Sequence, residues 1–262
     1  GRVEGTPPEL GLELALTASA QRVEVERLRL SGAGAEALLG ATAQQRDGRW
    51  ELASEGRLTE FDPLPWWAGA KASPWRRGGH RLNASWTLAL QLPREAETMA
   101  PQDLLLRLTG EGRVDVERSR LAGVPMAATV ALTQEAVGPQ SRQRGTRVTA
   151  TLDADGNRIR LEGQARPLVA GTQDRWTLEV DAPRLGALGP LASLVPAAAA
   201  WAPRQGQLTV RAEAEGRGAA LRTRGQLEAM ALTAGELSLA RGRATWEAAA
   251  DTTAPLAIEL DF

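Results

Sequence analysis

The sequence contains few residues that could perform chemistry. His80 is the only histidine among the 262 residues, and cysteine is absent. A zinc site or a histidine-based catalytic site would therefore need several carboxylates around one imidazole. Because Gly78, Gly79 and Arg81 flank His80, this residue is expected in a loop that enters a strand. The sequence predicts no catalytic residue, no metal site and no cofactor, and the chain is not expected to be an enzyme.

Two short motifs resemble ligand-binding loops but lack the surrounding pattern. Residues 32–37 read Gly-Ala-Gly-Ala-Glu-Ala and fit a loose dinucleotide fingerprint, yet Gly40 follows too soon for the helix that this fingerprint requires. Residues 153–157 read Asp-Ala-Asp-Gly-Asn and resemble the start of a calcium loop, but Gln164 stands where a bidentate glutamate is needed. Both motifs are predicted to be turns, and Asp155-Gly156 is typical of a tight hairpin.

Composition excludes several further classes of function. The formal net charge is −1, so the chain has no net field that would favour nucleic acid. The longest apolar window, residues 194–203, falls well short of the roughly 18 residues of a membrane-spanning helix, and no signal-peptide pattern opens the sequence. The chain starts almost directly in strand pattern and stops on a strand residue, Phe262. We therefore expect it to be a segment of a longer protein.

Strands must supply the framework for any site. From Gln207 to Gly216 apolar or small residues alternate with polar ones, which is the period of a strand with one wet face. The same alternation returns along the whole chain, with about fifteen strands expected at the spacing typical of an all-β fold. The pattern predicts an antiparallel meander with one apolar face and one face rich in arginine, glutamate and threonine.

The strand pattern repeats. Arg22–Gly32 and Arg113–Gly123 match at nearly every position and share a shift of apolar phase, which predicts a bulge or bend at Glu26–Arg27 and again at Glu117–Arg118. A second match has an offset of 126 or 127 residues, as in proteins built from repeated units. It comprises Arg-Trp-x-Leu at residues 49–52 and 175–178, Arg-Leu at 57–58 and 184–185, and Pro-Leu at 63–64 and 190–191. A short apolar piece, expected to be helical, follows each copy, at residues 61–68 and 185–201. The predicted units cover residues 10–100, 101–216 and, in part, 217–262.

Eight tryptophans allow two interpretations each. Trp50, Trp86, Trp176 and Trp246 are in phase with aliphatic residues of the strands, where they could pack in a core or stack on a ligand. The other four, in or beside the non-strand pieces, could plug the end of a sheet or contact lipid headgroups. They are Trp66, Trp67, Trp75 and Trp201.

The apolar face of so many strands cannot be left in water, because each strand carries several apolar side chains worth about 1.5–3 kcal/mol apiece when buried. Two short apolar pieces are too small to cover it. Either the sheet folds over on itself as a closed sandwich, or it curls into a trough that holds something apolar other than protein. The strand pattern leaves both arrangements open.

The sequence resembles the repetitive β-rich periplasmic region of the TamB proteins. TamB is the inner-membrane subunit of the translocation and assembly module and belongs to an AsmA-like group. The resemblance covers most of the chain and lies in the Arg-Trp-x-Leu motifs and in residues 61–64 (Phe-Asp-Pro-Leu), 80–88 (His-Arg-Leu-Asn-Ala-Ser-Trp-Thr-Leu), 221–229, 232–239 and 255–260. It implies an all-β fold: an elongated, curled antiparallel sheet, shaped like a taco with an open groove, built from tandem repeats with short helices between them.

The resemblance also implies a function. It suggests a periplasmic conduit of a Gram-negative bacterium that carries glycerophospholipids between the inner and outer membranes. The full-length protein would be anchored in the inner membrane and would reach a TamA-type outer-membrane barrel protein. The expected ligand is a phospholipid acyl chain, and no nucleic acid is expected. The alternative is a structural or docking module that aids outer-membrane protein assembly by β-strand augmentation.

Strand phase then selects the side chains that would line the groove and contact lipid. The predicted residues are Leu12, Leu14, Val23, Trp86, Leu88, Leu90, Leu104, Leu106, Trp176, Leu178, Val180, Leu208, Val210, Ile258 and Leu260.

Overall fold

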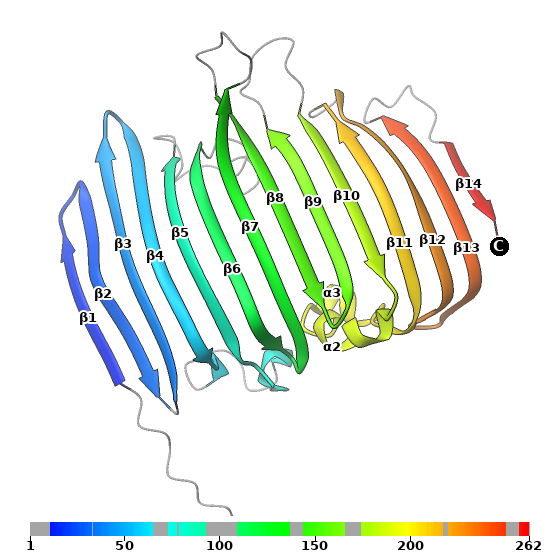
Figure 1. Ribbon diagram of the computed structural model, residues 1–262, viewed down its shortest axis with the longest axis horizontal. Helices are drawn as coiled ribbons and strands as arrows, with labels where there is room; N and C mark the ends of the chain where they lie inside the picture. Colours follow the sequence, from blue (N-terminus) through cyan, green and yellow to red (C-terminus); the bar gives the residue numbers. More distant parts are fainter. Residues whose placement is uncertain are drawn as a thin grey trace, which may run out of the picture.

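A computed structural model describes residues 11–32, 34–64, 73–77, 79–92, 109–136, 144–165, 174–216, 220–249 and 257–261. The fold is all-β. Fourteen strands form one open antiparallel sheet, and each strand is hydrogen-bonded to its neighbours in the chain, from β1 at one edge to β14 at the other (Figure 1). The strands are β1 Gly11–Ala18, β2 Arg22–Gly32, β3 Ala35–Arg46, β4 Arg49–Phe61, β5 Leu82–Leu92, β6 Thr109–Leu121, β7 Val124–Ala136, β8 Arg144–Ala154, β9 Asn157–Ala165, β10 Arg175–Ala182, β11 Pro203–Glu215, β12 Arg222–Ala234, β13 Leu237–Ala249 and β14 Ala257–Asp261.

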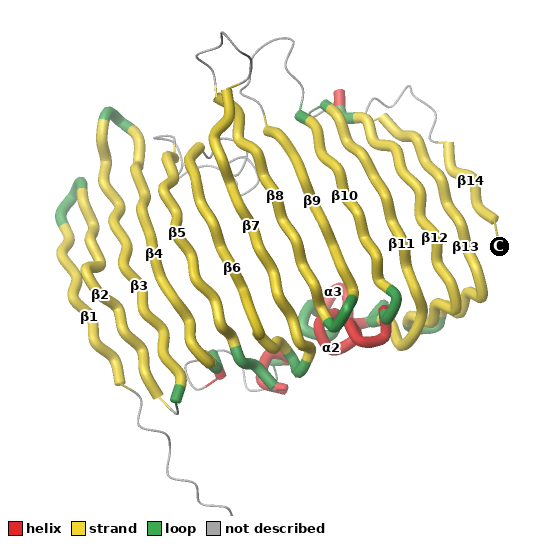
Figure 2. The backbone as a smooth tube through the Cα atoms, in the orientation of Figure 1, coloured by secondary structure: helices red, strands yellow, loops and turns green. Residues whose placement is uncertain are grey.

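Helical structure is short and lies at the strand ends (Figure 2). A 3₁₀ turn, η2 (Pro74–Arg77), precedes β5. Between β10 and β11 come the 3₁₀ turn η4 (Leu185–Leu188) and two single-turn helices, α2 (Gly189–Ala192) and α3 (Pro196–Ala199). Proline early in each of these helices suits an N-terminal turn, where an amide hydrogen would have no helical partner. This confirms the predicted helical piece at residues 185–201.

The first predicted helical piece differs from the structure. Phe61 is the last residue of β4 rather than the start of a helix, because β4 continues past a bulge and Phe61 pairs with Leu82 of β5. Residues 65–68 of that piece lie outside the described residues. Strand β5 has the predicted bounds, Leu82–Leu92.

Both predicted bulges are present. The register between β2 and β3 shifts between Val25 and Leu28, and that between β6 and β7 shifts between Val116 and Ser119. Such bulges leave extra residues unpaired and increase the local twist. The Asp155-Gly156 turn is also confirmed: it joins β8 to β9, and both residues have positive φ, 52° and 82°.

The sheet has no second layer within the described residues, so the closed sandwich does not form there. It is open and uncurled, with β1 and β14 as separate edges (Figure 1). The curled trough and the division into tandem units therefore stay predictions. The accessible surface is 17555 Å², against about 11,000 Å² for a compact monomer of this size. The chain therefore exposes far more surface than a compact domain would.

Candidate functional site

The clearest feature of the sheet is an apolar row that crosses all fourteen strands. Starting at Leu14 of β1, each residue is directly opposite the next across the strands, and every member is apolar or glycine. The row is Leu14, Leu28, Leu39, Gly56, Trp86, Val114, Val130, Ala150, Leu161, Leu178, Ala212, Gly225, Trp246 and Ile258.

A second such row runs beside the first on the same face. It consists of Leu12, Leu30, Ala37, Leu58, Ala84, Val116, Ala128, Leu152, Ile159, Val180, Val210, Leu227, Ala244 and Leu260. With neighbouring strands about 4.8 Å apart, each row is roughly 60 Å long. We call the face that carries both rows the apolar face.

Side chains in the middle of the apolar face are packed against one another but are not covered. Trp86, Leu88 and Leu90 of β5 are half-buried, as are Leu178 and Val180 of β10. The buried apolar residues of the described chain are few: four lie at strand ends, one in the interior of β12 and one in the η4–α3 segment. They are Val124, Ala154, Ala182, Leu194, Ala229 and Ala234. Among the residues that the structure describes, none forms a core above the centre of the sheet.

The structure places the predicted lining residues on this one face where it describes them. Trp86, Leu88, Leu90, Trp176, Leu178, Val180, Leu208 and Val210 lie in strands flanked on both sides. Leu12 and Leu14 lie in the edge strand β1, Val23 in β2, and Ile258 and Leu260 occupy register positions in β14. Leu104 and Leu106 lie outside the described residues.

Other members of the two rows were not predicted from the sequence. Leu28, Leu39 and Leu161 have the correct strand phase, which was the available signal. Their alignment across strands depends on turn lengths and bulges, and these fix the register.

Three tryptophans lie flat against glycines of the adjacent strand. Gly56 is opposite Trp86, Gly163 opposite Trp176, and Gly225 opposite Trp246. A Cβ built on these glycines would come within 1.9–2.3 Å of the indole. The rings therefore occupy the space that side chains at these glycines would fill. They lie along the apolar face and do not project from it.

Two buried polar side chains hold the helical segments to the sheet. The Asn157 amide donates to the carbonyls of Ala154 (2.9 Å) and Arg184 (3.1 Å) and accepts from the Arg184 amide (2.9 Å). His80 Nδ1 accepts from the Ala122 amide (3.3 Å), so Nε2 donates to the Trp75 carbonyl (2.7 Å). Asn157 joins the β8–β9 hairpin to the residue before η4, and His80 joins the β6–β7 hairpin to η2. His80 therefore has a structural role.

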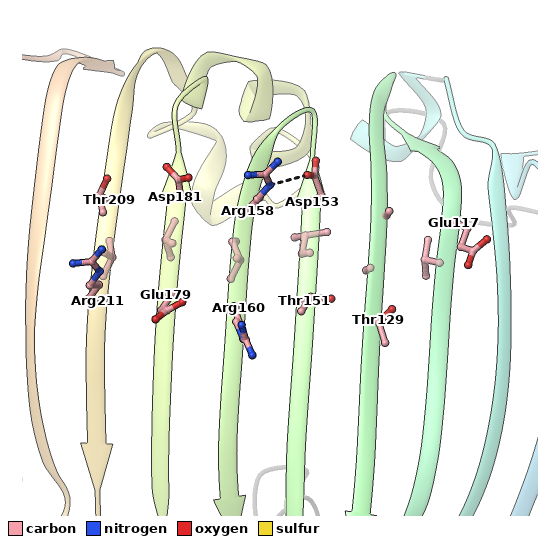
Figure 3. Close-up of a pocket in the computed structure, with 17 residues that line it drawn as sticks. Glu117, Thr129, Thr151, Asp153, Arg158, Arg160, Glu179, Asp181, Thr209 and Arg211 are labelled. Carbon is pink, nitrogen blue, oxygen red and sulfur yellow. Dashed lines mark hydrogen bonds and ion pairs between the residues drawn. The ribbon is translucent and has the colours of Figure 1, made fainter.

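The opposite, polar face carries cross-strand ion pairs. Arg29 contacts Glu13 (3.7 Å) and Glu36 (2.6 Å). Other pairs lie within one strand: in β6, hydrogen bonds from Arg113 hold the pKa of Asp115 below its ordinary value. Exposed pairs of this kind are worth about 0–1 kcal/mol each, so they favour the register of the strands more than they stabilise the fold. A shallow hollow of about 800 Å³ lies on this face, with Asp153 and Arg158 3.4 Å apart at its rim (Figure 3).

The two motifs that resemble ligand loops are turns. Gly34 has a φ of 82° in the connection between β2 and β3, and Asp153 Oδ1 accepts a hydrogen bond from the Gly156 amide. Among the described residues no group of three or more histidine, aspartate or glutamate side chains could hold a metal ion. Nor does the described chain contain a helix with the length and hydrophobicity needed to cross a bilayer.

No family model, curated protein or solved structure matches this chain.

Proposed function

We propose that this chain is part of a periplasmic conduit on which the acyl chains of glycerophospholipids move between the inner and outer membranes. The observation that carries the proposal is the pair of unbroken apolar rows, over which the described part of the chain places no second layer. Transfer of an acyl chain from the bilayer into water costs about 0.8 kcal/mol of free energy per methylene group. A continuous aliphatic surface replaces water at every step and lowers this barrier along the whole path, without energy input from the chain.

The finer architecture belongs to the same proposal. We propose that the sheet curls in the complete protein, with the apolar face inside, and that it is built from tandem units, as the resemblance to TamB proteins implies. The matching bulges in β2 and β6 and the matching roles of His80 and Asn157 support a repeated plan. A membrane anchor and contact with a TamA-type barrel protein would come from other parts of a longer chain.

The first test is a direct search for lipid. Mass spectrometry of the purified protein should detect co-isolated phospholipid, and phosphatidylcholine with brominated acyl chains should quench the fluorescence of the tryptophans on the apolar face. Leu88→Asp and Leu178→Asp should abolish both signals, because each places a charge in the path of the acyl chain. Thr87→Asp is the matched control, since Thr87 is exposed on the opposite face of the same strand.

Circular dichroism should show that all three variants keep their strand content, because the substituted side chains are not buried in a core. Unchanged lipid signals in both leucine variants, or a protein with neither lipid nor quenching, would refute the conduit.

One observation favours a second function, docking by strand augmentation. Among the described strands β1 pairs only with β2, and its three leucines are exposed: Leu12 63%, Leu14 57% and Leu16 54%. An unpaired edge with a row of apolar side chains is a template for another strand. Glu13 on its polar face would favour a partner strand with arginine at the facing position.

A further inference from the structure

A cluster of arginines lies at the end of the sheet where β5 begins and β6 ends. Arg81 and Arg120 are directly opposite each other and exchange backbone hydrogen bonds of 2.8 and 2.7 Å. Like charges in directly opposed positions destabilise an antiparallel pair. The bulge in β6 adds a third guanidinium, because Arg118 (φ 46°) is one of its unpaired residues. We call these three residues the arginine cluster.

The cluster borders a hollow of about 310 Å³ on the polar face. Pro125 and Ala127, which have no long side chains, leave the space beside Arg120 open. Asp153 and Asp155 line the far side of the same hollow. The other bulge residue, Glu117, lines the larger neighbouring hollow (Figure 3).

The carboxylates near the cluster already have partners. Asp153 contacts Arg158 at 3.4 Å, Asp155 contacts Arg184 at 3.2 Å, and Glu60 contacts Arg81 at 3.0 Å. Arg118 and Arg120, in contrast, have no carboxylate partner among the residues that the structure describes. Two guanidinium groups therefore face the hollow with unused donors.

The equivalent bulge in β2 provides an internal comparison. Its sequence, Val-Glu-Arg-Leu-Arg-Leu, corresponds to Val-Glu-Arg-Ser-Arg-Leu in β6. There, Arg29 occupies the place of Arg120 and is neutralised by Glu13 and Glu36. Around Arg120 the neighbours across the strands are Arg81 and Pro125 instead. The same type of bulge thus carries an arginine paired with two carboxylates in β2, whereas in β6 Arg118 and Arg120 have no carboxylate partner among the described residues.

We propose that the arginine cluster binds a phosphate group. Guanidinium groups present planar pairs of donors that match phosphate oxygens, and charge-assisted hydrogen bonds of this kind are the strongest available to exposed side chains. A bound phosphate also offsets the positive charge of Arg118 and Arg120, which lie beside the hollow. The phosphate belongs either to a soluble ester or to a lipid headgroup. This site lies on the face opposite the apolar rows, and it does not rest on the proposed conduit.

The test compares matched pairs of variants. Titration calorimetry with inorganic phosphate should show saturable binding to the unaltered protein. The double variant Arg118→Gln/Arg120→Gln should weaken it by about tenfold or more, because hydrogen bonds to charged groups are lost. Arg27→Gln/Arg29→Gln removes the same number of charges at the equivalent bulge and should leave phosphate affinity unchanged.

A second arm identifies the source of the phosphate. Flotation with vesicles of phosphatidylglycerol and phosphatidylcholine that exceeds flotation with phosphatidylcholine alone would assign an anionic lipid headgroup, provided that Arg118→Gln/Arg120→Gln loses the excess. Phosphate binding without this excess would assign a soluble ester. The proposal is overturned if neither probe binds, or if both double variants lose binding equally, since that would reflect only the general charge of the face.

Discussion

At the scale of single residues, the orientation of Trp86, Trp176 and Trp246 keeps the apolar face level. Each indole lies over a glycine on the next strand, and the Trp86 ring is fixed further by a hydrogen bond from Nε1 to the Ser54 hydroxyl (3.0 Å). A tryptophan that stood upright would interrupt the rows with a ridge. The flat rings keep the rows continuous and leave their π faces toward the open side. Both earlier interpretations, packing and ligand stacking, are compatible with this position.

Gly163 tests this arrangement. A methyl group at Gly163 would lie 1.9 Å from Cε3 of Trp176, so Gly163→Ala should force the ring away from the strand and lower the free energy of unfolding by about 1–3 kcal/mol. Urea denaturation measures the loss, and the tryptophan emission spectrum reports the displaced ring. At Gly40 an added Cβ would meet only Glu55, at 3.8 Å. Gly40→Ala should therefore leave both measurements nearly unchanged, and equal losses in the two variants would contradict the explanation.

At the scale of elements, the burial of this protein is concentrated where helical segments meet strand ends. The segment from η4 to α3 contacts the start of β11, and Gly235, in the turn between β12 and β13, approaches the Ala200 carbonyl so closely that a Cβ there would lie 2.6 Å from the oxygen. These contacts close one margin of the apolar face and leave the rest open. Two residues of the β8–β9 hairpin bond Arg184, the residue before η4: Asn157 by hydrogen bonds to its backbone and Asp155 by an ion pair of 3.2 Å.

Asn157→Ala should release this segment. The substitution leaves buried donors and acceptors of Ala154 and Arg184 without partners, which costs about 1–3 kcal/mol. Hydrogen exchange should accelerate across residues 185–202 while the centres of β4 and β5 stay protected. Gln207→Ala, at an exposed position in β11, is the control and should change stability by less than about 0.5 kcal/mol. Uniformly faster exchange over the whole sheet would show that Asn157 acts on global stability instead.

The sequence predicted elements well because their signals are local. The bounds of β5, the bulges at Glu26–Arg27 and Glu117–Arg118 and the Asp155-Gly156 turn follow from alternation, phase shift and turn chemistry. Two features could not be read in this way. Whether a second layer covers the apolar face depends on contacts between distant segments, and the pairing of Trp176 with Gly163 depends on register. The arginine cluster was missed because Arg81 and Arg120 are distant in sequence.

At the scale of the whole molecule, the edge at β1 separates the two proposed functions. Successive backbone N–H groups of a strand point in opposite directions. Of the two variants Glu13→Pro and Leu14→Pro, one therefore removes an N–H donor from the open edge of β1, and the other removes one that faces β2. The first should leave the pairing with β2 intact. A peptide of residues 22–32, whose own strand pairs with β1, is a suitable probe. Fluorescence anisotropy should show that it binds the unaltered protein and that the proline at the open side weakens binding.

Lipid quenching in the same two variants provides the comparison. If the edge serves docking and the apolar face serves lipid, peptide binding should fall while quenching by brominated lipid persists. A scrambled peptide that binds equally well would argue against a specific edge.

The strand order has a consequence for how the sheet is made. Every described strand pairs only with its neighbours in the chain. An N-terminal strand can therefore form its hydrogen bonds before the C-terminal strands have been synthesised. Local topologies of this kind form quickly, and the sheet can assemble hairpin by hairpin from either end as the polypeptide emerges. Adding or deleting a pair of strands would lengthen or shorten the sheet without changing the order in which the other strands pair. The span between two surfaces could thus be adjusted by evolution one hairpin at a time.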